Sequence, residues 1–204
     1  MKSLLNITKE TAYYRGKEIT HGIGYDAYML ELNKLDKKFG RVSGHNSSKG
    51  FNVETAFVDH LGTAARSPKA SWDAVSHDGK KWEIRTRNFC RVNAGIHFVG
   101  STDAQTRPWT WYGQGTVFDC IKKKCNAVDT FLVADTSRTG EKGLLEWWEI
   151  PSKTIIELYT RDEWRGALTK AGKVRRSPDG KADKEMYQLS IARFRRTMKW
   201  IFNK

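Results

Sequence analysis

Apolar residues recur every three or four positions in several parts of the chain, which is the spacing of side chains on one face of a helix. Four stretches with this period are predicted to be helical: Tyr25–Phe39, Asn52–Leu61, Val117–Cys125 and Tyr187–Ile201. A further helix is predicted to open at Thr160, because Glu163 follows at the spacing of a capping box. The pattern therefore places helices in both halves of the chain.

Strand patterns occupy the middle of the chain. Asp78-Gly79 separates two strand-like runs, and this dipeptide is typical of a tight hairpin turn. The pattern predicts an antiparallel hairpin of Trp72–Ser76 and Lys81–Arg87. Three more strands are predicted in short apolar runs: Ile96–Val99, Thr130–Asp135 and Leu145–Ile150, the last with Trp147 and Trp148 on opposite faces. Helices interleaved with strands indicate an α/β fold with a central mixed β-sheet flanked by helices.

The length of 204 residues is typical of one domain. We expect a single domain over residues 1–204, with a basic helical C-terminal part from about residue 160 onward. No apolar run reaches the roughly 18 residues of a membrane-spanning helix, and residues 1–14 lack the apolar centre of a signal peptide. Three cysteines make a disulfide framework improbable, so a reduced, cytoplasmic protein is expected.

Charge narrows the choice of partner. Lys and Arg number 36 against 23 Asp and Glu, and a net charge of +13 favours an anionic partner such as nucleic acid. Residues 161–204 alone hold 13 Lys and Arg against 5 Asp and Glu, a net charge of +8. Eight basic side chains are candidate DNA contacts: Lys49, Arg87, Arg107, Arg175, Arg176, Arg195, Arg196 and Lys199. The last three are expected to point outward from the final helix, where the alternative is a solvated face without a partner. The aromatic loop at residues 107–115 could stack on bases or close over the core.

The predicted hairpin carries the strongest chemical signal. Strand alternation places Glu83, Arg85 and Arg87 on one face. Antiparallel pairing can bring Asp73 close to Glu83 and Arg85, so that two carboxylates and a cation meet at one point. One or two carboxylates, with water and substrate phosphate, hold Mg²⁺ in proteins. Such an ion activates water and neutralises charge on a scissile phosphate. The alternative is an ordinary hairpin with a cross-strand ion pair.

These residues resemble the catalytic hairpin of the PD-(D/E)xK nucleases, the superfamily of many type II restriction endonucleases. Asp73 takes the place of the Asp in the motif, and Glu83 that of the acidic residue in Glu-x-Lys. Arg85 stands where the family usually has Lys. Because Arg does not deprotonate at neutral pH, it would stabilise charge on the phosphate but not act as a base. Many members add a Glu from the preceding helix, which Glu54 matches. The alternative for Glu54 is a favourable interaction with the helix dipole.

The resemblance implies a restriction-endonuclease-like fold and a Mg²⁺-dependent endodeoxyribonuclease that cuts at a specific double-stranded DNA site. It implies Asp73, Glu83 and Arg85 as catalytic residues, and Asp73, Glu83 and Glu54 as Mg²⁺ ligands. A homodimer is expected, because a two-fold protein suits a symmetric site. No phosphate-binding loop for a nucleotide cofactor is present. The alternative function is a non-catalytic nucleic-acid-binding protein, and a less favoured one is a structural protein with an acidic partner.

Overall fold

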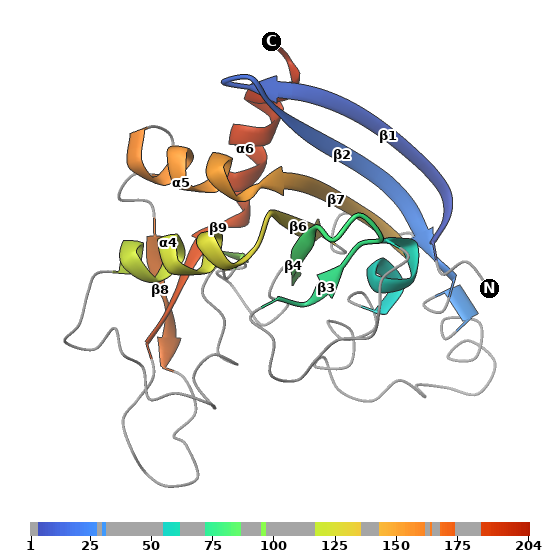
Figure 1. Ribbon diagram of the computed structural model, residues 1–204, viewed down its shortest axis with the longest axis horizontal. Coiled ribbons are helices and arrows are strands. Elements are labelled where there is room, and N and C mark those ends of the chain that lie inside the picture. The colour runs from blue at the N-terminus through green and yellow to red at the C-terminus, as the bar shows by residue number, and fades with distance from the viewer. Residues whose placement is uncertain are drawn as a thin grey trace, which may run out of the picture.

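Figure 1 shows the computed structural model of the chain. The structure describes the residues 4–27, 30–31, 55–61, 72–86, 95–96, 117–135, 143–161, 164, 168–173 and 185–204. Within them the chain forms an α/β fold, a mixed six-stranded sheet with helices on both of its faces. None of the helices in these ranges is long and apolar enough to cross a membrane.

The main sheet has the strand order β1-β2-β7-β6-β4-β3. Its strands are β1 (Leu4–Tyr14), β2 (Lys17–Asp26), β3 (Ala74–Val75), β4 (Lys81–Thr86), β6 (Thr130–Asp135) and β7 (Leu144–Pro151). β4 and β6 pair in parallel, whereas the other neighbouring strands pair antiparallel. The sheet is therefore mixed, which confirms the prediction of an α/β fold with a central mixed sheet.

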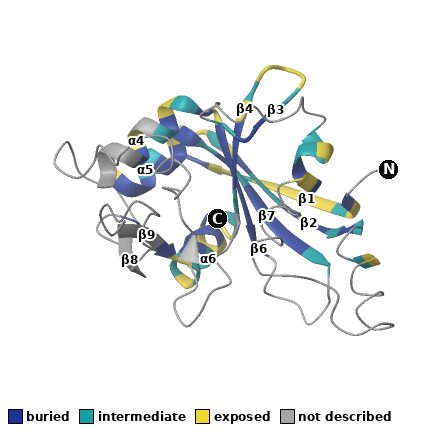
Figure 2. Cartoon of the chain, turned by 90° about the horizontal axis from the view of Figure 1, so that it is seen from below, coloured by how far each residue is buried: buried dark blue, intermediate teal, exposed yellow. Residues whose placement is uncertain are grey.

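Helices cover both faces of this sheet (Figures 1 and 2). Three of them pack on one face: α4 (Val117–Ala127), α5 (Ser152–Arg161) and α6 (Ile191–Phe202). The helix at residues 55–61 packs on the other face. The two cores separate along β6, where Phe131 and Val133 belong to the first and Leu132 and Ala134 to the second. β6 is buried along its whole length because it has a helical layer on each side.

The two tryptophans of β7 pack into these two cores, one into each. Trp147 packs against Phe57 of the helix at residues 55–61, with ring centroids 5.2 Å apart. Trp148 packs against Phe194 of α6, with ring centroids 5.0 Å apart. The prediction that they lie on opposite faces is confirmed. Adjacent residues of a strand point to opposite sides of a sheet, so one dipeptide anchors both helical layers.

A second, three-stranded antiparallel sheet has the order β5-β9-β8. Its strands are β5 (Gly95–Ile96), β8 (Leu168–Lys173) and β9 (Glu185–Ser190). Tyr187, predicted to belong to the last helix, lies in β9 and pairs with Lys170. The region after residue 160 is therefore not purely helical, because strand pairing overrides the helical spacing of Tyr187.

The last helix otherwise follows the prediction. α6 begins at Ile191 because Ser190 caps it, and the Ser190 hydroxyl oxygen accepts a hydrogen bond from Arg193 N. The predicted apolar stripe is buried at Phe194, Met198 and Ile201. α4, β6, β7 and the β3–β4 hairpin also lie where the sequence predicted them, within one to three residues at their ends.

The N-terminal residues differ most from the prediction. β1 and β2 have 11 and 10 residues and are the longest of the described strands, yet no strand was predicted there. β1 lies at the edge of the sheet and most of its residues are exposed, so it lacks the apolar alternation that marks a half-buried strand. Tyr25, predicted to start a helix, lies in β2 and pairs with Leu5 and Leu144. Residues 32–39 of that prediction lie outside the described residues.

The helix predicted to open at Thr160 is also wrong. Thr160 lies in the last turn of α5, where its hydroxyl donates a hydrogen bond to Ile156 O at 2.8 Å. A hydroxyl that bonds back to the preceding turn is satisfied inside the helix and does not need a capping position. Glu163, the other member of the expected capping box, lies outside the described residues.

Substitution of Gly22 in β2 is expected to destabilise the protein, because a β-carbon there would lie 2.3 Å from Trp147 Cε2. Trp147 is 0% exposed and has no space to retreat. Gly22→Ala should lower the free energy of unfolding by about 1–3 kcal/mol, the usual cost of overpacking a core. Urea denaturation measures this loss. Gly24→Ala is the milder comparison and should lose less, since its β-carbon would lie 3.2 Å from its nearest neighbour, Leu5 O. Equal losses in the two variants would contradict the steric explanation.

Candidate active site

The β3–β4 hairpin holds the candidate site, and its turn sets the pairing of the two strands. Gly79 has φ +81°, a conformation that glycine adopts without strain. Ser76 N donates to Lys80 O at 2.9 Å, and Ser76 Oγ accepts from Trp82 Nε1 at 3.0 Å. The resulting register places Ala74 opposite Trp82. Asp73, one residue before β3, therefore lies level with the middle of β4.

Asp73 is held against β4 by two hydrogen bonds. Its backbone N–H donates to Trp82 O at 2.9 Å, and its carboxylate oxygen Oδ2 accepts from Ile84 N at 2.9 Å. The residue is 9% exposed. Because Trp82 and Ile84 flank Glu83 in the strand, the Asp73 carboxylate lies beside Glu83. The predicted meeting of these two acidic residues is confirmed.

Glu83 points from β4 toward α4 and is 1% exposed. One of its carboxylate oxygens pairs with Arg85, and the other lies 2.8 Å from Lys124 Nζ. Burial is the largest influence on the pKa of Glu83 and raises it. The positive charges of Arg85 and Lys124 lower this pKa, whereas the nearby Asp73 carboxylate raises it. The net pKa lies above the ordinary value. Two carboxylates and two cations thus gather at one buried point.

Two carboxylates are within the donor set that usually holds Mg²⁺, with water and substrate phosphate completing the shell. Glu83 Oε2 is buried and lies 2.8 Å from Lys124 Nζ. Because an ionised carboxylate oxygen has more than one lone pair, it can contact this ammonium group and a metal ion together. Within the described ranges, no group of three or more His, Cys, Asp or Glu side chains is arranged to hold a metal. Any third protein ligand must come from other residues, and Glu54 lies outside the described residues.

Lys124 is the site residue that the sequence analysis missed. It follows Lys122 and Lys123, and residue type alone does not tell which of the three lysines turns toward the sheet. The helical spacing does give a signal, because Lys124 borders the stripe of Ile121 and Cys125, which are buried. Its side chain is 12% exposed, whereas Lys122 is exposed.

Cys125 lies next to this cluster and is a free, buried thiol. Burial raises the pKa of Cys125 to about 12, and the charge of Glu83 contributes in the same direction. The thiol is therefore protonated at neutral pH. Because thiolates and not thiols are nucleophiles, Cys125 does not supply a nucleophile to the site.

The other predicted contact residues divide into three groups. Arg196 and Lys199 are exposed on α6, as predicted. Arg195 was predicted to point outward, but its side chain is 18% exposed and is held in ion pairs with Asp135 and Glu146. Because carboxylates removed from water need a positively charged partner, Arg195 turns inward toward them. The remaining predicted positions lie outside the described residues: Lys49, Glu54, Arg87, Arg107, Arg175, Arg176 and the aromatic loop at 107–115.

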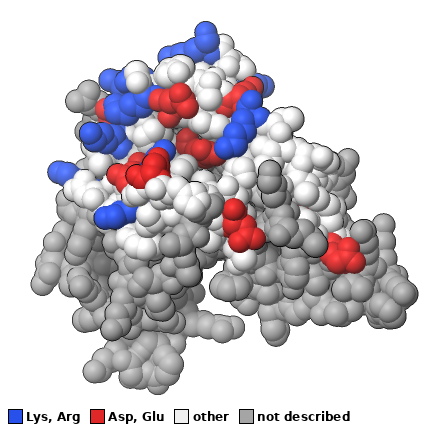
Figure 3. Space-filling model, turned by 45° about the vertical axis from the view of Figure 1, so that its right-hand side comes forward, with Lys and Arg blue, Asp and Glu red and all other residues white. Residues whose placement is uncertain are grey.

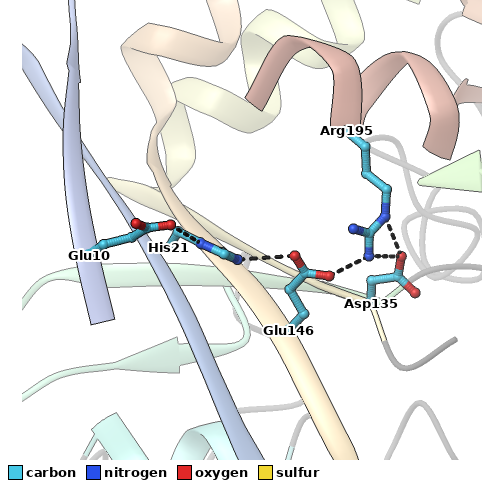
Figure 4. A network of polar contacts seen from close by, with 5 residues as sticks. All are labelled: Glu10, His21, Asp135, Glu146 and Arg195. Atoms are coloured by element: carbon cyan, nitrogen blue, oxygen red, sulfur yellow. Dashed lines mark hydrogen bonds and ion pairs between the residues drawn. The ribbon is translucent and has the colours of Figure 1, made fainter. Parts of the chain in front are cut away.

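Arg195 belongs to a polar network that joins α6 to four strands of the main sheet, β6, β7, β2 and β1 (Figure 4). Arg195 donates to Asp135 Oδ2 at 2.6 Å and to Glu146 Oε2 at 2.5 Å. The other oxygen of Glu146 lies 3.1 Å from His21 Nε2, and His21 Nδ1 lies 2.6 Å from Glu10 Oε1. His21 also stacks on Trp148 with ring centroids 5.1 Å apart. Three carboxylates thus face one guanidinium and one imidazole.

Stability is expected to fall as the pH rises through the pKa of His21. Burial by itself would lower this pKa, but hydrogen bonds and charges from Glu146 and Glu10 outweigh it and raise the pKa above 6.5. This stabilisation is fully present below the pKa of His in the unfolded chain, and it is lost as the pH exceeds the raised folded-state value. Urea unfolding at a series of pH values from about 6 to about 9 measures the decline. A His21→Gln variant with an equal decline would contradict this assignment.

A comparison of the chain with protein-family models, with curated proteins and with solved structures found no match. The class of the protein is therefore defined by its architecture, an α/β fold with helices on both faces of a mixed six-stranded sheet. The features of this chain that bear on function are the Asp73–Glu83 site and the net charge of +13.

Proposed function

We propose that this protein is a Mg²⁺-dependent endodeoxyribonuclease of the PD-(D/E)xK type, with a restriction-endonuclease-like fold. The observation that carries the proposal is the position of Asp73 beside Glu83 on adjacent strands, with Arg85 and Lys124 at the Glu83 carboxylate. Buried charges cost stability unless they are paired, so a cluster of four is the kind of feature that functional sites retain.

Each residue has a distinct part in this proposal. Asp73 and Glu83 hold Mg²⁺, and Glu54 joins them as the family resemblance implies. The bound ion supplies an activated water and neutralises charge on the scissile phosphate. Arg85 stabilises the negative charge that develops on the phosphate, since a guanidinium matches phosphate oxygens. Lys124 positions the Glu83 carboxylate.

The substrate in this proposal is double-stranded DNA. A net charge of +13 favours an anionic polymer, and exposed Arg196 and Lys199 are suited to phosphate contacts. The protein acts as a homodimer, so that two copies of the site reach the two strands of a symmetric sequence.

A second candidate function is a non-catalytic nucleic-acid-binding protein. The observation that favours it is that both oxygens of Glu83 lie within ion-pair distance of a cation. A carboxylate so compensated is stable without a metal, and the basic surface would then bind nucleic acid without cutting it.

Incubation of the protein with supercoiled plasmid DNA separates the two candidates. The nuclease proposal expects nicked and linear products with Mg²⁺ and none with EDTA. If the wild-type protein leaves DNA intact, Arg85→Lys restores the usual family residue and is expected to cut. Salt-dependent binding without cleavage by either protein, with Mg²⁺ or Mn²⁺, would support the non-catalytic candidate and overturn the nuclease.

A further inference from the structure

Trp200 is a large aromatic side chain that the fold leaves at the surface. It lies in the last turns of α6 and is 43% exposed. The edge of its ring meets Tyr14, with ring centroids 6.3 Å apart at 63°, and Tyr14 is itself 5% exposed. Figure 1 shows the tip of the β1–β2 hairpin beside the end of α6. Trp200 is therefore anchored by packing at one edge, while 43% of the residue remains accessible.

Several positive side chains lie near this ring. Lys204 Nζ lies 3.6 Å from the Trp200 ring centroid, and the Arg15 guanidinium lies 5.6 Å from the Tyr14 ring centroid. Arg196 is exposed one helical turn before Trp200, with exposed Lys199 alongside. No Asp or Glu occurs between residues 190 and 204. Figure 3 shows Lys and Arg side chains, with Asp and Glu among them, in the upper part of the molecule. We call this set the Trp200 surface: Arg15, Arg196, Lys199, Trp200 and Lys204.

An aromatic face among cations is complementary to a nucleotide, since cations bind the phosphates and the ring stacks on the base. In a duplex the faces of the bases are stacked on one another, so only an unpaired base presents a free face. Lys204 covers part of the Trp200 ring, but an exposed cation–π contact is weaker than base stacking. A base can therefore displace the Lys204 amine, which is then available to a neighbouring phosphate.

We propose that the Trp200 surface binds unpaired nucleotides, so that the preferred DNA carries a single-stranded segment, such as a gap or a flap, beside the duplex that the Asp73–Glu83 site would cut. The inference rests on the proposed nuclease function for its choice of nucleic acid as the partner. It adds a substrate class that neither the hairpin motif nor the net charge indicates.

Binding of fluorescein-labelled oligonucleotides, followed by anisotropy in EDTA, tests the inference without cleavage. The probes are single-stranded DNA, single-stranded RNA of the same sequence, blunt duplex DNA and gapped duplex DNA. Wild-type protein is expected to bind the single-stranded and gapped probes more tightly than the blunt duplex. Trp200→Ala should weaken single-stranded and gapped binding by about tenfold and leave duplex binding within about twofold. Comparison of the DNA and RNA probes identifies which single strand is preferred.

Matched variants separate stacking from folding and from charge. Trp200→Leu keeps an apolar contact with Tyr14 but has no aromatic face, so it should lose binding as Trp200→Ala does, whereas Trp200→Phe should keep most of it.

Lys199→Ala should weaken the binding of all four probes and lower the salt dependence by roughly one phosphate contact. The controls are Tyr13→Ala, an exposed aromatic of β1 at 64% exposure, and Lys153→Ala, an exposed lysine of α5.

Two results would overturn the inference. One is an unchanged affinity of Trp200→Leu for the single-stranded and gapped probes. The other is Trp200-dependent binding to vesicles of phosphatidylcholine and phosphatidylserine with no Trp200-dependent binding to oligonucleotides, which would make a lipid surface the partner. Failure of the nuclease proposal has a separate readout. If that proposal is wrong, wild-type protein does not cleave plasmid DNA, whereas the binding of oligonucleotides in EDTA is unaffected.

Discussion

Asp73→Asn is expected to reduce Mg²⁺-dependent cleavage of plasmid DNA by about a thousandfold, which corresponds to the loss of about 4 kcal/mol of transition-state stabilisation. The amide removes the negative charge of Asp73 but keeps an oxygen that can accept the hydrogen bond from Ile84 N. The fold should therefore survive while the metal affinity and the chemistry do not. Initial rates of nicking, measured over a series of Mg²⁺ concentrations, give the effect.

The matched control is Asp78→Asn, in the turn of the same hairpin. Asp78 is exposed and bonds only to its neighbours Ser76 and Lys80, so its charge is remote from the Glu83 carboxylate. This variant should cut at close to the wild-type rate. Circular dichroism and urea unfolding confirm that both variants are folded. A folded Asp73→Asn protein that cuts as fast as wild type would remove Asp73 from the catalytic site.

Arg195→Ala is expected to lower the free energy of unfolding by about 3 kcal/mol, the lower end of the range for removing one partner of a buried ion pair. The loss arises because Asp135, 1% exposed in its side chain, and Glu146, 10% exposed, would lose the guanidinium that pairs with both of them. Arg195 itself is 18% exposed, so water can replace part of the lost interaction. Urea denaturation at neutral pH measures the change.

Arg196→Ala is the control, because it removes the same charge from the next residue of α6, where the side chain is exposed. It should change stability by no more than about 0.5 kcal/mol, as is usual for surface substitutions. Arg195→Lys keeps the charge but not the forked geometry, so we expect an intermediate loss. Similar stabilities of Arg195→Ala and Arg196→Ala would show that the network in Figure 4 does not hold α6 to the sheet.

The candidate site was predictable because its signals are local. Asp78-Gly79 marks the turn, the alternation of β4 assigns Glu83 and Arg85 to one face, and the turn then fixes which residues of the two strands meet. The structure confirms that Asp73 lies beside Glu83. Lys124 could not be assigned in the same way, since it reaches the site from α4, and the packing of that helix on the sheet depends on residues far from the hairpin.

The N-terminal strands illustrate a different reason for failure. β1 is an edge strand with mostly exposed side chains, so its apolar pattern is weak, and its place in the sheet depends on pairing with β2. β2 in turn pairs with β7, more than a hundred residues later in the chain. Strand pairing between such distant segments leaves no short-range signal in either of them.

The sequence by itself determined the α/β class, the β3–β4 hairpin, the buried strand β6 and the apolar stripe of α6, because periods of two and of 3.6 residues and turn residues act within a few positions. Only the tertiary structure decided which charges are paired. Arg195 and Arg196 are adjacent and alike, yet Arg195 meets Asp135 and Glu146, which are 60 and 49 residues away, while Arg196 remains exposed. Burial sets this difference, since a carboxylate removed from water must find a cation, and the fold decides which one lies within reach.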